Sequence, residues 1–310
     1  MANGKRVNVE NGENTSPAVL NGTTPSRKRR SANRPRPKMG QHFLADPSTA
    51  QKIVDALGDV SDTTVVEIGP GMGILTSLLA ERARRLMAIE LDRVLAAQLR
   101  MKYSGTPNVE IIEGDVLAID ISTLFAPMPG RSRPGLPSLP TKARLVGNLP
   151  YYITSPILTH LFRFHQHFES LVIMVQREVA DRIAAKPGGS EYGLLSATAQ
   201  LYAKVERLFV VPASAFNPPP KVQSAVLRLT IAPQLEKLRV PEPEFVDFLK
   251  LSFGQKRKTL LNNLKPHYAP ASLKAALEKS RIKPNARAEA VSLDKMADLF
   301  RNLESVVSSQ

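Results

Sequence analysis

The segment Val146–Leu158, with the sequence VGNLPYYITSPIL, contains the residues of this chain whose types and spacing could do chemistry. An asparagine, Asn148, is followed by Leu149, Pro150 and Tyr151. The segment has no carboxylate, cysteine or histidine that could act as a general base. Its chemistry therefore has to come from hydrogen-bond acceptors and a flat aromatic face.

These features suit one reaction, transfer of a group to the exocyclic amine of adenine. That amine is a poor nucleophile because its lone pair is delocalised into the ring. The side-chain oxygen of Asn148 and the carbonyl of Leu149 could accept its two hydrogens and draw the nitrogen toward tetrahedral geometry. Pro150 would fix the turn and remove a competing N–H, and Tyr151 would hold a base taken out of its stack. Taken alone, the tetrapeptide is typical of a strand-ending turn with a core tyrosine; the glycine loop and the two acids described below favour the catalytic interpretation.

A glycine-rich loop precedes this segment in the chain. The sequence EIGPGMGIL follows an apolar strand and opens a helix, with glycines at Gly69, Gly71 and Gly73. Free N–H groups and close backbone approach at such a loop suit a nucleotide-like ligand. The dinucleotide-binding fingerprint requires a glycine where this chain has Ile74. The loop alone could also be a tight turn.

Two carboxylates favour a particular ligand. Glu90 ends the second predicted strand, where its oxygens could accept both hydroxyls of a ribose. Asp115 follows the third predicted strand and could accept a hydrogen bond from an adenine amine. Together with the glycine loop they lie at the carboxyl ends of strands, where open α/β sheets bind ligands. The arrangement indicates S-adenosylmethionine rather than NAD as the cofactor, although each acid alone could be an ordinary loop residue.

The elements that must position these residues follow from the apolar pattern. Strands alternate with helices, which predicts an α/β fold with a Rossmann-like, doubly wound parallel sheet. After about Pro241 the pattern is purely helical. We therefore expect a methyltransferase domain at 38–235 and a small C-terminal helical domain at 240–310. Strands are predicted at 63–68, 84–90, 109–115, 143–148, 170–176 and, as a late strand, 221–231; helices in the first half are predicted at 46–57, 74–82 and 93–103.

Positive charge is concentrated at the N-terminus. The formal net charge of the chain is +14, and residues 1–38 supply half of it. We expect residues 1–37 to be a disordered basic tail, either a solvated extension or an arm that binds polyanions. The Pro/Gly-rich segment 126–142 is expected to be an inserted loop. The excess of positive charge in the rest of the chain favours a nucleic-acid partner.

Composition excludes several other classes of protein. The chain has no cysteine, which excludes disulfides and thiolate metal sites. His160, His165 and His167 lack the usual spacing of metal ligands, so we predict no metal. No window reaches the roughly 20 apolar residues of a membrane span, and the N-terminus lacks the apolar core of a signal peptide. We expect a soluble, cytoplasmic monomer that does not bind membranes.

With these motifs in order, the chain resembles the small-subunit ribosomal RNA adenine dimethyltransferase family (KsgA type) from Gln41 to its end. The resemblance is carried by QHFL (41–44), VVEIGPGMGILT (65–76), IELD (89–92), EGD (113–115), GNLPYYITSPIL (147–158), VQREVADRIAAKPGGSEYGLLS (175–196), FNPPPKVQSAV (216–226) and FGQKRKTLLNNL (253–264).

The resemblance implies a role for individual residues. The target adenine would be held by Asn148 and Tyr151, with Phe216 closing on its other face. Ribosomal RNA would dock on the helical domain and nearby basic residues. The residues implied in S-adenosylmethionine binding are His42, Leu44, Gly69, Gly71, Glu90, Asp115 and Asn148; those implied in RNA binding are Lys221, Lys256, Arg257 and Lys258.

The sequence departs from the family pattern at His42, where the family usually has Asn, and in the length of the 126–142 insertion. Two other functions remain open: an antibiotic-resistance type adenine methylase of large-subunit RNA, and a non-catalytic ribosome-assembly factor on the same fold. The segment FGQKRKTLLNNL favours small-subunit RNA, and the intact Asn148–Tyr151 motif argues against loss of activity.

Overall fold

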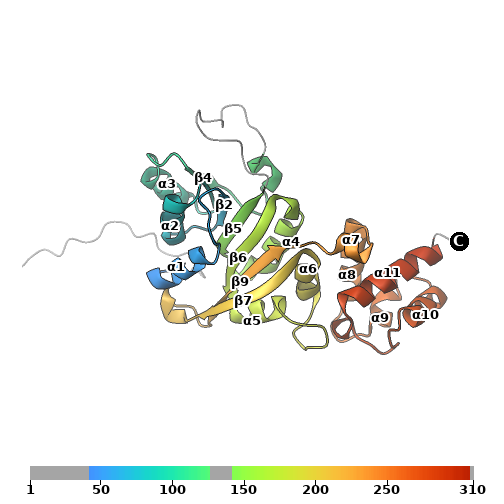
Figure 1. The fold of residues 1–310 in the computed structure, drawn as a ribbon. Coiled ribbons are helices and arrows are strands. Elements are labelled where there is room, and N and C mark those ends of the chain that lie inside the picture. Colours follow the sequence, from blue (N-terminus) through green and yellow to red (C-terminus); the bar gives the residue numbers. More distant parts are fainter. Residues whose placement is uncertain (1–41, 126–141, 308–310) are drawn as a thin grey trace, which may run out of the picture. The chain divides into compact units, whose positions relative to one another are not determined.

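The computed structural model describes residues 42–125 and 142–307, in which a seven-stranded sheet has the order β4-β3-β2-β5-β6-β9-β7 (Figure 1). The predicted tail at 1–37 and nearly all of the predicted insertion at 126–142 lie outside these residues. The strands are β2 (Thr64–Ile68), β3 (Arg85–Glu90), β4 (Val109–Glu113), β5 (Ala143–Asn148), β6 (Phe168–Gln176), β7 (Ala203–Val211) and β9 (Ser224–Ile231).

The first half of the sheet follows the sequence pattern closely. β2 pairs in parallel with β3 and β5, and β3 pairs in parallel with β4. Helices α1 (Pro47–Asp55), α2 (Ile74–Arg82) and α3 (Arg93–Lys102) alternate with these strands. The N-cap of α1 is Asp46, whose carboxylate accepts from the main-chain N–H of Thr49 at 2.9 Å, as the Asp-Pro start predicts.

Consecutive residues of the central strands are buried in different hydrophobic clusters, one on each face of the sheet. Val65 is buried in one cluster with α1 and α2, and Val66 is buried in another on the opposite face. Because successive side chains of a strand alternate between faces, an apolar run such as Val65-Val66 marks a strand buried on both sides. The second face is covered by α4 (Thr154–Phe162) and α6 (Leu194–Tyr202).

The second half of the sheet corrects the prediction in two respects. β9 starts at Ser224 rather than Lys221, and it runs antiparallel to both β6 and β7, so the sheet is not wholly parallel. β7 is an edge strand that the sequence analysis missed. Its exposed charged residues, Lys204 and Glu206, obscure the apolar alternation, as is common in edge strands that avoid pairing with other chains.

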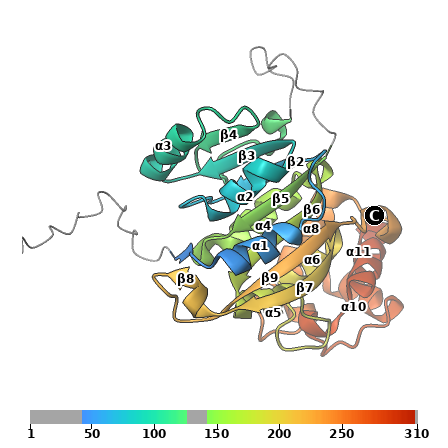
Figure 2. The same ribbon diagram turned by 60° about the vertical axis from the view of Figure 1, so that its left-hand side comes forward.

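A second, two-stranded sheet joins distant parts of the chain. β1 (Phe43–Leu44) pairs antiparallel with β8 (Phe216–Asn217), with Leu44 opposite Phe216. The main-chain N–H groups of Ala45 and Asp46 both donate to the carbonyl of Ala215, at 2.8 and 3.1 Å. Figure 2 shows β8 beside α1. This small sheet was not predicted because it depends on pairing across more than 170 residues.

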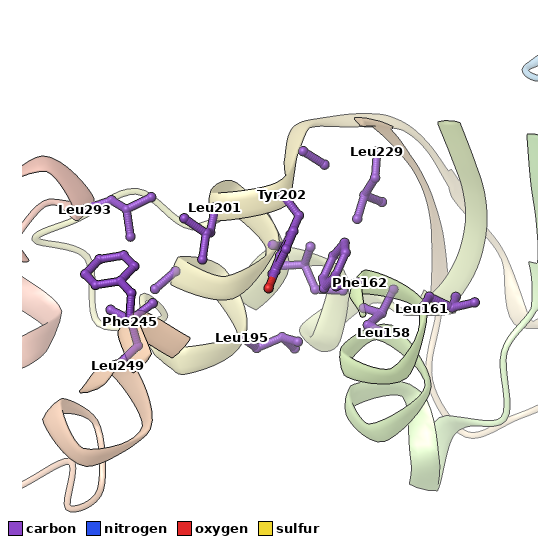
Figure 3. Close-up of a cluster of buried hydrophobic side chains, with 14 of the residues drawn as sticks. Leu158, Leu161, Phe162, Leu195, Leu201, Tyr202, Leu229, Phe245, Leu249 and Leu293 are labelled. Carbon is purple, nitrogen blue, oxygen red and sulfur yellow. The ribbon is translucent and has the colours of Figure 1, made fainter. Parts of the chain in front are cut away.

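The C-terminal segment is helical, as expected. It contains α8 (Glu242–Ser252), α9 (Leu260–Leu264), α10 (Pro270–Lys279) and α11 (Leu293–Val307). The remaining α-helices of the described residues are α5 (Arg177–Ile183) and α7 (Leu235–Leu238). Leu201 and Tyr202 of α6 belong to the same buried cluster as Phe245 of α8 (Figure 3). The hydroxyl of Tyr202 also donates to Glu242 Oε1 at 2.7 Å. Buried side chains and a hydrogen bond thus connect the predicted domains 38–235 and 240–310. The division of the chain into these two domains stays a prediction.

Candidate active site

A cavity of about 230 Å³ lies at the carboxyl ends of β2, β3 and β5. Its walls come from the glycine loop, the turns after β3 and β4, the segment after β5 and the start of the described chain. The predicted site residues that line it are His42, Gly69, Gly71, Glu90, Asp115, Asn148, Leu149, Pro150 and Tyr151. The structure thus brings together residues more than 100 positions apart in the sequence.

The glycine loop is shaped by its own main chain. Gly69 has φ +67° and donates its N–H to the carbonyl of Ile89 at 2.9 Å. Gly71 has φ +57°, and a Cβ added there would lie 2.9 Å from Cδ1 of Phe43. Both the left-handed conformation and the close approach of the Phe43 ring therefore require glycine at position 71.

Glu90 is oriented by two main-chain donors. Its Oε2 accepts from Gly71 N at 2.9 Å and its Oε1 accepts from Asp92 N at 2.8 Å. The side chain is buried at the edge of the cavity. Each carboxylate oxygen can accept more than one hydrogen bond, so Glu90 retains acceptor capacity for a ligand diol while its orientation is held by the protein.

Asp115 has a similar but more exposed arrangement. Its Oδ1 accepts from the main-chain N–H of Leu117 at 2.9 Å, and the residue lines the cavity. One such bond leaves most of the acceptor sites of a carboxylate unused. The side chain therefore fits the predicted role of an acceptor for an adenine amine.

Glu67 lies in β2 just before the glycine loop and is almost completely buried. Burial raises the pKa of its carboxyl to about 8, with a further contribution from the nearby negative charge of Glu90. Its Oε2 has no hydrogen-bond partner among the described residues. At neutral pH the Glu67 side chain is therefore mostly protonated.

Asn148 ends β5 with its amide held in one orientation. Its Nδ2 donates to the main-chain carbonyl of His42 at 3.2 Å. If Oδ1 stood in place of Nδ2, it would face the carbonyl oxygen of His42 without a proton between them. The nitrogen of the amide is therefore the atom that points to His42. The other end, Oδ1, is buried and has no hydrogen-bond partner among the described residues. A buried acceptor without a donor costs about 1–3 kcal/mol, so this oxygen is suited to receive a donor from a ligand.

The residues after Asn148 form a short, closed turn. The N–H of Leu149 donates to the carbonyl of Met174 at 3.0 Å, which fixes the direction of this peptide. The carbonyl of Pro150 accepts from Ile153 N at 3.2 Å and from Thr154 Oγ1 at 3.1 Å. The Pro150 carbonyl is thus occupied within the turn, and the residue's main contribution is its restricted backbone.

Tyr151 begins this turn, in a 3₁₀ helix that spans Tyr151–Ile153. Its hydroxyl lies 2.7 Å from Oγ of Ser224, at the start of β9. Burial raises the pKa of the hydroxyl, and the hydrogen bond with Ser224 offsets part of this increase. The tyrosine is therefore neutral at physiological pH and serves as an anchored ring rather than as a base.

Two of the residues predicted to bind the cofactor or the target base do not line the cavity. Leu44 and Phe216 are buried and face each other in the β1–β8 pair. In this arrangement Phe216 is part of the core beneath the site, so contact with a target base would require the segment around it to rearrange. The roles predicted for both residues stay predictions.

The basic residues predicted to bind RNA are all exposed. Lys221 lies in the loop before β9, three residues from Ser224. Lys256, Arg257 and Lys258 lie between α8 and α9, and Lys256 Nζ donates to the carbonyl of Ser190 at 2.9 Å. This bond ties the basic segment to the loop before α6, and RNA contact by all four residues stays a prediction.

The sequence analysis missed several residues at the site. Phe43 and Tyr152 line the cavity, and Ser224 anchors Tyr151. Tyr152 is 80% exposed. Its position directly after Tyr151 was a sequence signal that could have identified it. The parts played by Phe43 and Ser224 depend on contacts between distant segments and leave no local signal.

The three histidines noted in the sequence have other partners. His160 Nε2 lies 3.0 Å from the carbonyl of Ile119, and His165 Nδ1 lies 2.9 Å from the carbonyl of Phe162. The ring of His167 stacks on that of Phe125, with centroids 5.0 Å apart. In the described part of the chain, no group of three or more His, Cys, Asp or Glu residues could hold a metal ion. None of the described helices is long and apolar enough to span a membrane.

With this geometry in view, comparison with known proteins identifies the family. The sequence profile described as ribosomal RNA adenine dimethylase matches residues 32–305. The chain belongs to the ribosomal RNA adenine dimethylase family. It is therefore a methyltransferase of the kind that the resemblance predicted, with the Rossmann-like fold expected from the sequence.

Curated relatives support this assignment over most of the chain. The chain is 58% identical over 266 residues to "Ribosomal RNA small subunit methyltransferase A" of Koribacter versatilis, covering 86% of this chain and 93% of the relative. A protein of the same name from Acidobacterium capsulatum is 50% identical over 270 residues, covering 87% and 91%.

Solved structures give the same fold. A dimethyladenosine transferase from Plasmodium falciparum aligns with a TM-score of 0.66 and 26% identity, over 85% of this chain and 98% of that one. The 23S rRNA methyltransferase ErmE aligns with a TM-score of 0.58 and 28% identity, over 84% and 99%.

Proposed function

We propose that this enzyme transfers methyl groups to the N6 amine of adenines in small-subunit ribosomal RNA. The product is N6,N6-dimethyladenine on two adjacent adenines, made while the ribosomal subunit matures. The observation that carries the reaction type is the buried Oδ1 of Asn148, which lacks a partner among the described residues while its Nδ2 is held by His42.

The site can activate an amine without a base. Asn148 Oδ1 accepts one hydrogen of the N6 amine, and the carbonyl of Leu149 accepts the other. Two acceptors localise the nitrogen lone pair, and the ring of Tyr151 keeps the base in place. The monomethylated amine retains one N–H, which Asn148 Oδ1 or the Leu149 carbonyl could still accept once the methyl group has turned away from the donor. The proton displaced in each transfer would pass to solvent.

The residues on the other side of the cavity fit S-adenosylmethionine as the methyl donor. Glu90 would accept the ribose hydroxyls, and Asp115 would accept from the adenine amine of the cofactor. Gly69 and Gly71, which line the cavity, would lie against its methionine part. The bound cofactor supplies an activated methyl group; the protein supplies orientation and hydrogen bonds.

The RNA class follows from charge and from the relatives. Basic residues of the loop before β9 and of the helical segment are exposed, which suits phosphate contacts made at a distance from the target base. The curated relatives that are 58% and 50% identical carry names that specify the small subunit. We expect the enzyme to act as a monomer in the cytoplasm, where ribosomal subunits mature.

The test is methylation of purified ribosomal subunits that lack the modification. The protein is incubated with labelled S-adenosylmethionine and either small or large subunits, and the modified bases are mapped by mass spectrometry. We expect two neighbouring dimethyladenines in small-subunit RNA only.

The fold similarity to ErmE favours a second candidate, methylation of large-subunit RNA. Label found only in large-subunit RNA would establish that function and overturn the one proposed. No label in either subunit would leave the non-catalytic assembly role, although an intact amine-binding turn argues against that outcome.

A further inference from the structure

We infer that Tyr152 is an RNA-binding residue that stacks on the base of the nucleotide next to the target adenine, outside the cavity. The inference rests on the proposed function, because it names a further part of the RNA substrate that the same site would hold. It gives a role to an aromatic side chain that the chemistry at Asn148 and Tyr151 does not use.

The fold leaves the side chain of Tyr152 uncovered. The residue lines the cavity although most of its surface is exposed, which places it at the opening. Among residues 42–125 and 142–307 it has no hydrogen-bond or ring partner. Single exposed apolar side chains are common on proteins, so the exposure of this ring gains meaning from its position at a ligand cavity.

A second exposed apolar residue marks the other side of this opening. Of the large apolar side chains exposed in the described part of the chain, Leu91 and Tyr152 are the two that line the cavity. Leu91 directly follows Glu90, on the proposed cofactor side, whereas Tyr152 directly follows Tyr151, on the target side. The uncovered ring therefore belongs to the side that would receive RNA.

The local helix directs Tyr151 and Tyr152 to different places. Both lie in the 3₁₀ helix Tyr151–Ile153, and a helix with three residues per turn separates consecutive side chains by about 120°. The hydroxyl of Tyr151 lies 2.7 Å from Oγ of Ser224, which holds that ring toward β9. Tyr152 therefore cannot share one base with Tyr151, and its exposed ring is available to a group that stays outside the cavity.

The backbone that carries Tyr152 is held in place. The carbonyl of Pro150 accepts from Ile153 N at 3.2 Å and from Thr154 Oγ1 at 3.1 Å, one hydrogen bond on each side of the 3₁₀ turn. Thr154 is itself buried at the start of α4. The ring is thus presented from a fixed turn, so that binding has only the side-chain rotation to restrict.

The nucleotide next to a flipped adenine has the chemistry that fits this position. When the target base leaves its stack, the neighbouring base loses a stacking partner. An aromatic side chain can replace that partner, because every base has a flat π-face. The sequence from Lys142 to Phe168 contains no Asp or Glu, so this segment does not repel the phosphate between the two nucleotides. In the proposed pair of adjacent adenines, the neighbour is the second adenine.

The experiment compares RNAs of equal charge that differ by one base. They are the single strand UUAAUU and two forms of it in which either the first or the second adenine is replaced by an abasic ribose. Affinities are measured by fluorescence anisotropy at low salt, where phosphate contacts are strong, with S-adenosylhomocysteine present. Calorimetry with S-adenosylmethionine measures cofactor affinity separately.

The variants are Tyr152→Ala, Tyr152→Leu and Tyr152→Phe. Leu keeps an apolar side chain without a flat face, and Phe keeps the face without the hydroxyl. The matched control is Met101→Ala in α3, since Met101 is 75% exposed and does not line the cavity. Circular dichroism confirms that each variant is folded, and KM and kcat are measured with undermethylated small subunits.

We expect the unaltered enzyme to bind UUAAUU roughly 5- to 50-fold more tightly than the abasic RNA that lacks the base beside the bound adenine. Tyr152→Ala and Tyr152→Leu should reduce this ratio to less than about twofold, whereas Tyr152→Phe and Met101→Ala should retain it. With small subunits, Tyr152→Ala should raise KM by a similar factor and change kcat less than about threefold, because the contact is the same before and during methyl transfer. Cofactor affinity should stay within about twofold in every variant, since stacking on the neighbouring base involves no cofactor atom.

An equal loss of affinity for all three RNAs in Tyr152→Ala would overturn the inference and place the ring on the target adenine itself. A rise in the cofactor Kd of tenfold or more, with the RNA ratio retained, would assign the ring to the cofactor. The inference would also be wrong if the unaltered enzyme bound UUAAUU no more tightly than either abasic RNA. If Tyr152→Ala did not fold, the contrast between the Leu and Phe variants would decide.

Failure of the proposed function would be recognised separately. If the unaltered enzyme methylated neither ribosomal subunit, that function would be refuted by itself. The titrations with UUAAUU and its abasic forms would still report whether Tyr152 stacks on a neighbouring base, because they require no turnover.

Discussion

We propose that one side of the cavity holds the cofactor and the other the target base, and these two sides are built in different ways. The cofactor side consists of the ends of β2 and β3, the glycine loop and the turn after β4, all within residues 64–116, and its central contacts are main-chain N–H groups on Glu90. The target side combines His42, the turn after β5 and Ser224, segments that lie more than 70 residues apart. Its contacts depend on individual side chains.

This difference indicates how each side can be altered. The shape of the cofactor side is set by backbone conformation, so most side-chain substitutions leave it intact, and those at glycine distort it. On the target side, removal of one side chain leaves the strand ends in place and removes a single contact. Changes on the target side should therefore separate catalysis from folding, whereas changes at the glycines of the cofactor side should affect cofactor binding and stability together.

The largest effect is expected from Asn148→Ala. The variant loses the amine acceptor Oδ1 and the bond to the carbonyl of His42, while β5 keeps its ladder. Removal of one preorganised polar group of this kind costs on the order of 100-fold or more in turnover. Single-turnover methylation of undermethylated small subunits measures this loss.

The control for this variant is Asn285→Ala, at an exposed asparagine of the helical segment, which should retain full activity. Near-normal turnover by folded Asn148→Ala would contradict the amine-acceptor mechanism.

Substitutions of Tyr151 should divide its two functions. Tyr151→Ala removes the stacking face, worth roughly 1–3 kcal/mol, and should raise KM for the RNA substrate by about 5- to 100-fold. Tyr151→Phe keeps the face and loses only the bond to Ser224, at a cost of about 1 kcal/mol. Steady-state kinetics on small subunits provides both values, with Tyr268→Phe as the matched control.

Calorimetry with the cofactor tests whether Tyr151 contributes to target binding and not to cofactor binding. If Tyr151→Ala abolished cofactor binding and left RNA binding intact, the division of the cavity into two sides would be wrong.

On the cofactor side, Gly71→Ala should damage binding and folding together. The added methyl group meets the ring of Phe43 at 2.9 Å, and the left-handed backbone disfavours any Cβ. Overpacking of this kind costs about 1–3 kcal/mol. Both the midpoint of chemical unfolding and the affinity for S-adenosylmethionine should fall. A variant that kept its stability but lost affinity would show that the loop contacts the cofactor without shaping the fold.

The last effect, which is small for any one pH unit, concerns the pH dependence of stability. The pKa of Glu67 is raised to about 8 in the folded protein, so the native state binds a proton that the unfolded chain releases near its ordinary pKa of 4.5. This contribution to stability is fully present below about pH 4.5 and is lost as the pH rises toward 8. Relative to Glu67→Gln, the unaltered protein should lose about 1 kcal/mol per pH unit between these values.

Urea unfolding of the two proteins at several values of pH from 5 to 8 measures this difference. Parallel pH profiles would mean that Glu67 is ionised in the folded state and that the negative charge beside the glycine loop is larger than we infer.

Much of the cofactor side was predictable from the sequence because its determinants are local. The bounds of α2 and β5 agree with the prediction to the residue, and the glycine loop and Glu90 lie where the apolar pattern placed them. A glycine loop between a buried strand and a helix has few conformations, and parallel strands bring their carboxyl ends to one edge whatever the rest of the chain does. The motif Asn148–Tyr151 was likewise visible, since its chemistry requires only adjacent residues.

The tertiary structure alone decided the remaining features. The antiparallel direction of β9, the edge strand β7 and the β1–β8 pair depend on pairing between segments far apart in the chain. The orientation of the Asn148 amide, the anchoring of Tyr151 by Ser224 and the placement of the His42 ring have the same origin. Local propensity and periodicity report what one segment can form, whereas a hydrogen bond across 70 or more residues exists only after loops have closed and the cores have packed. The sequence therefore determined which chemical groups the site contains, and the packing of distant segments determined how those groups face the substrate.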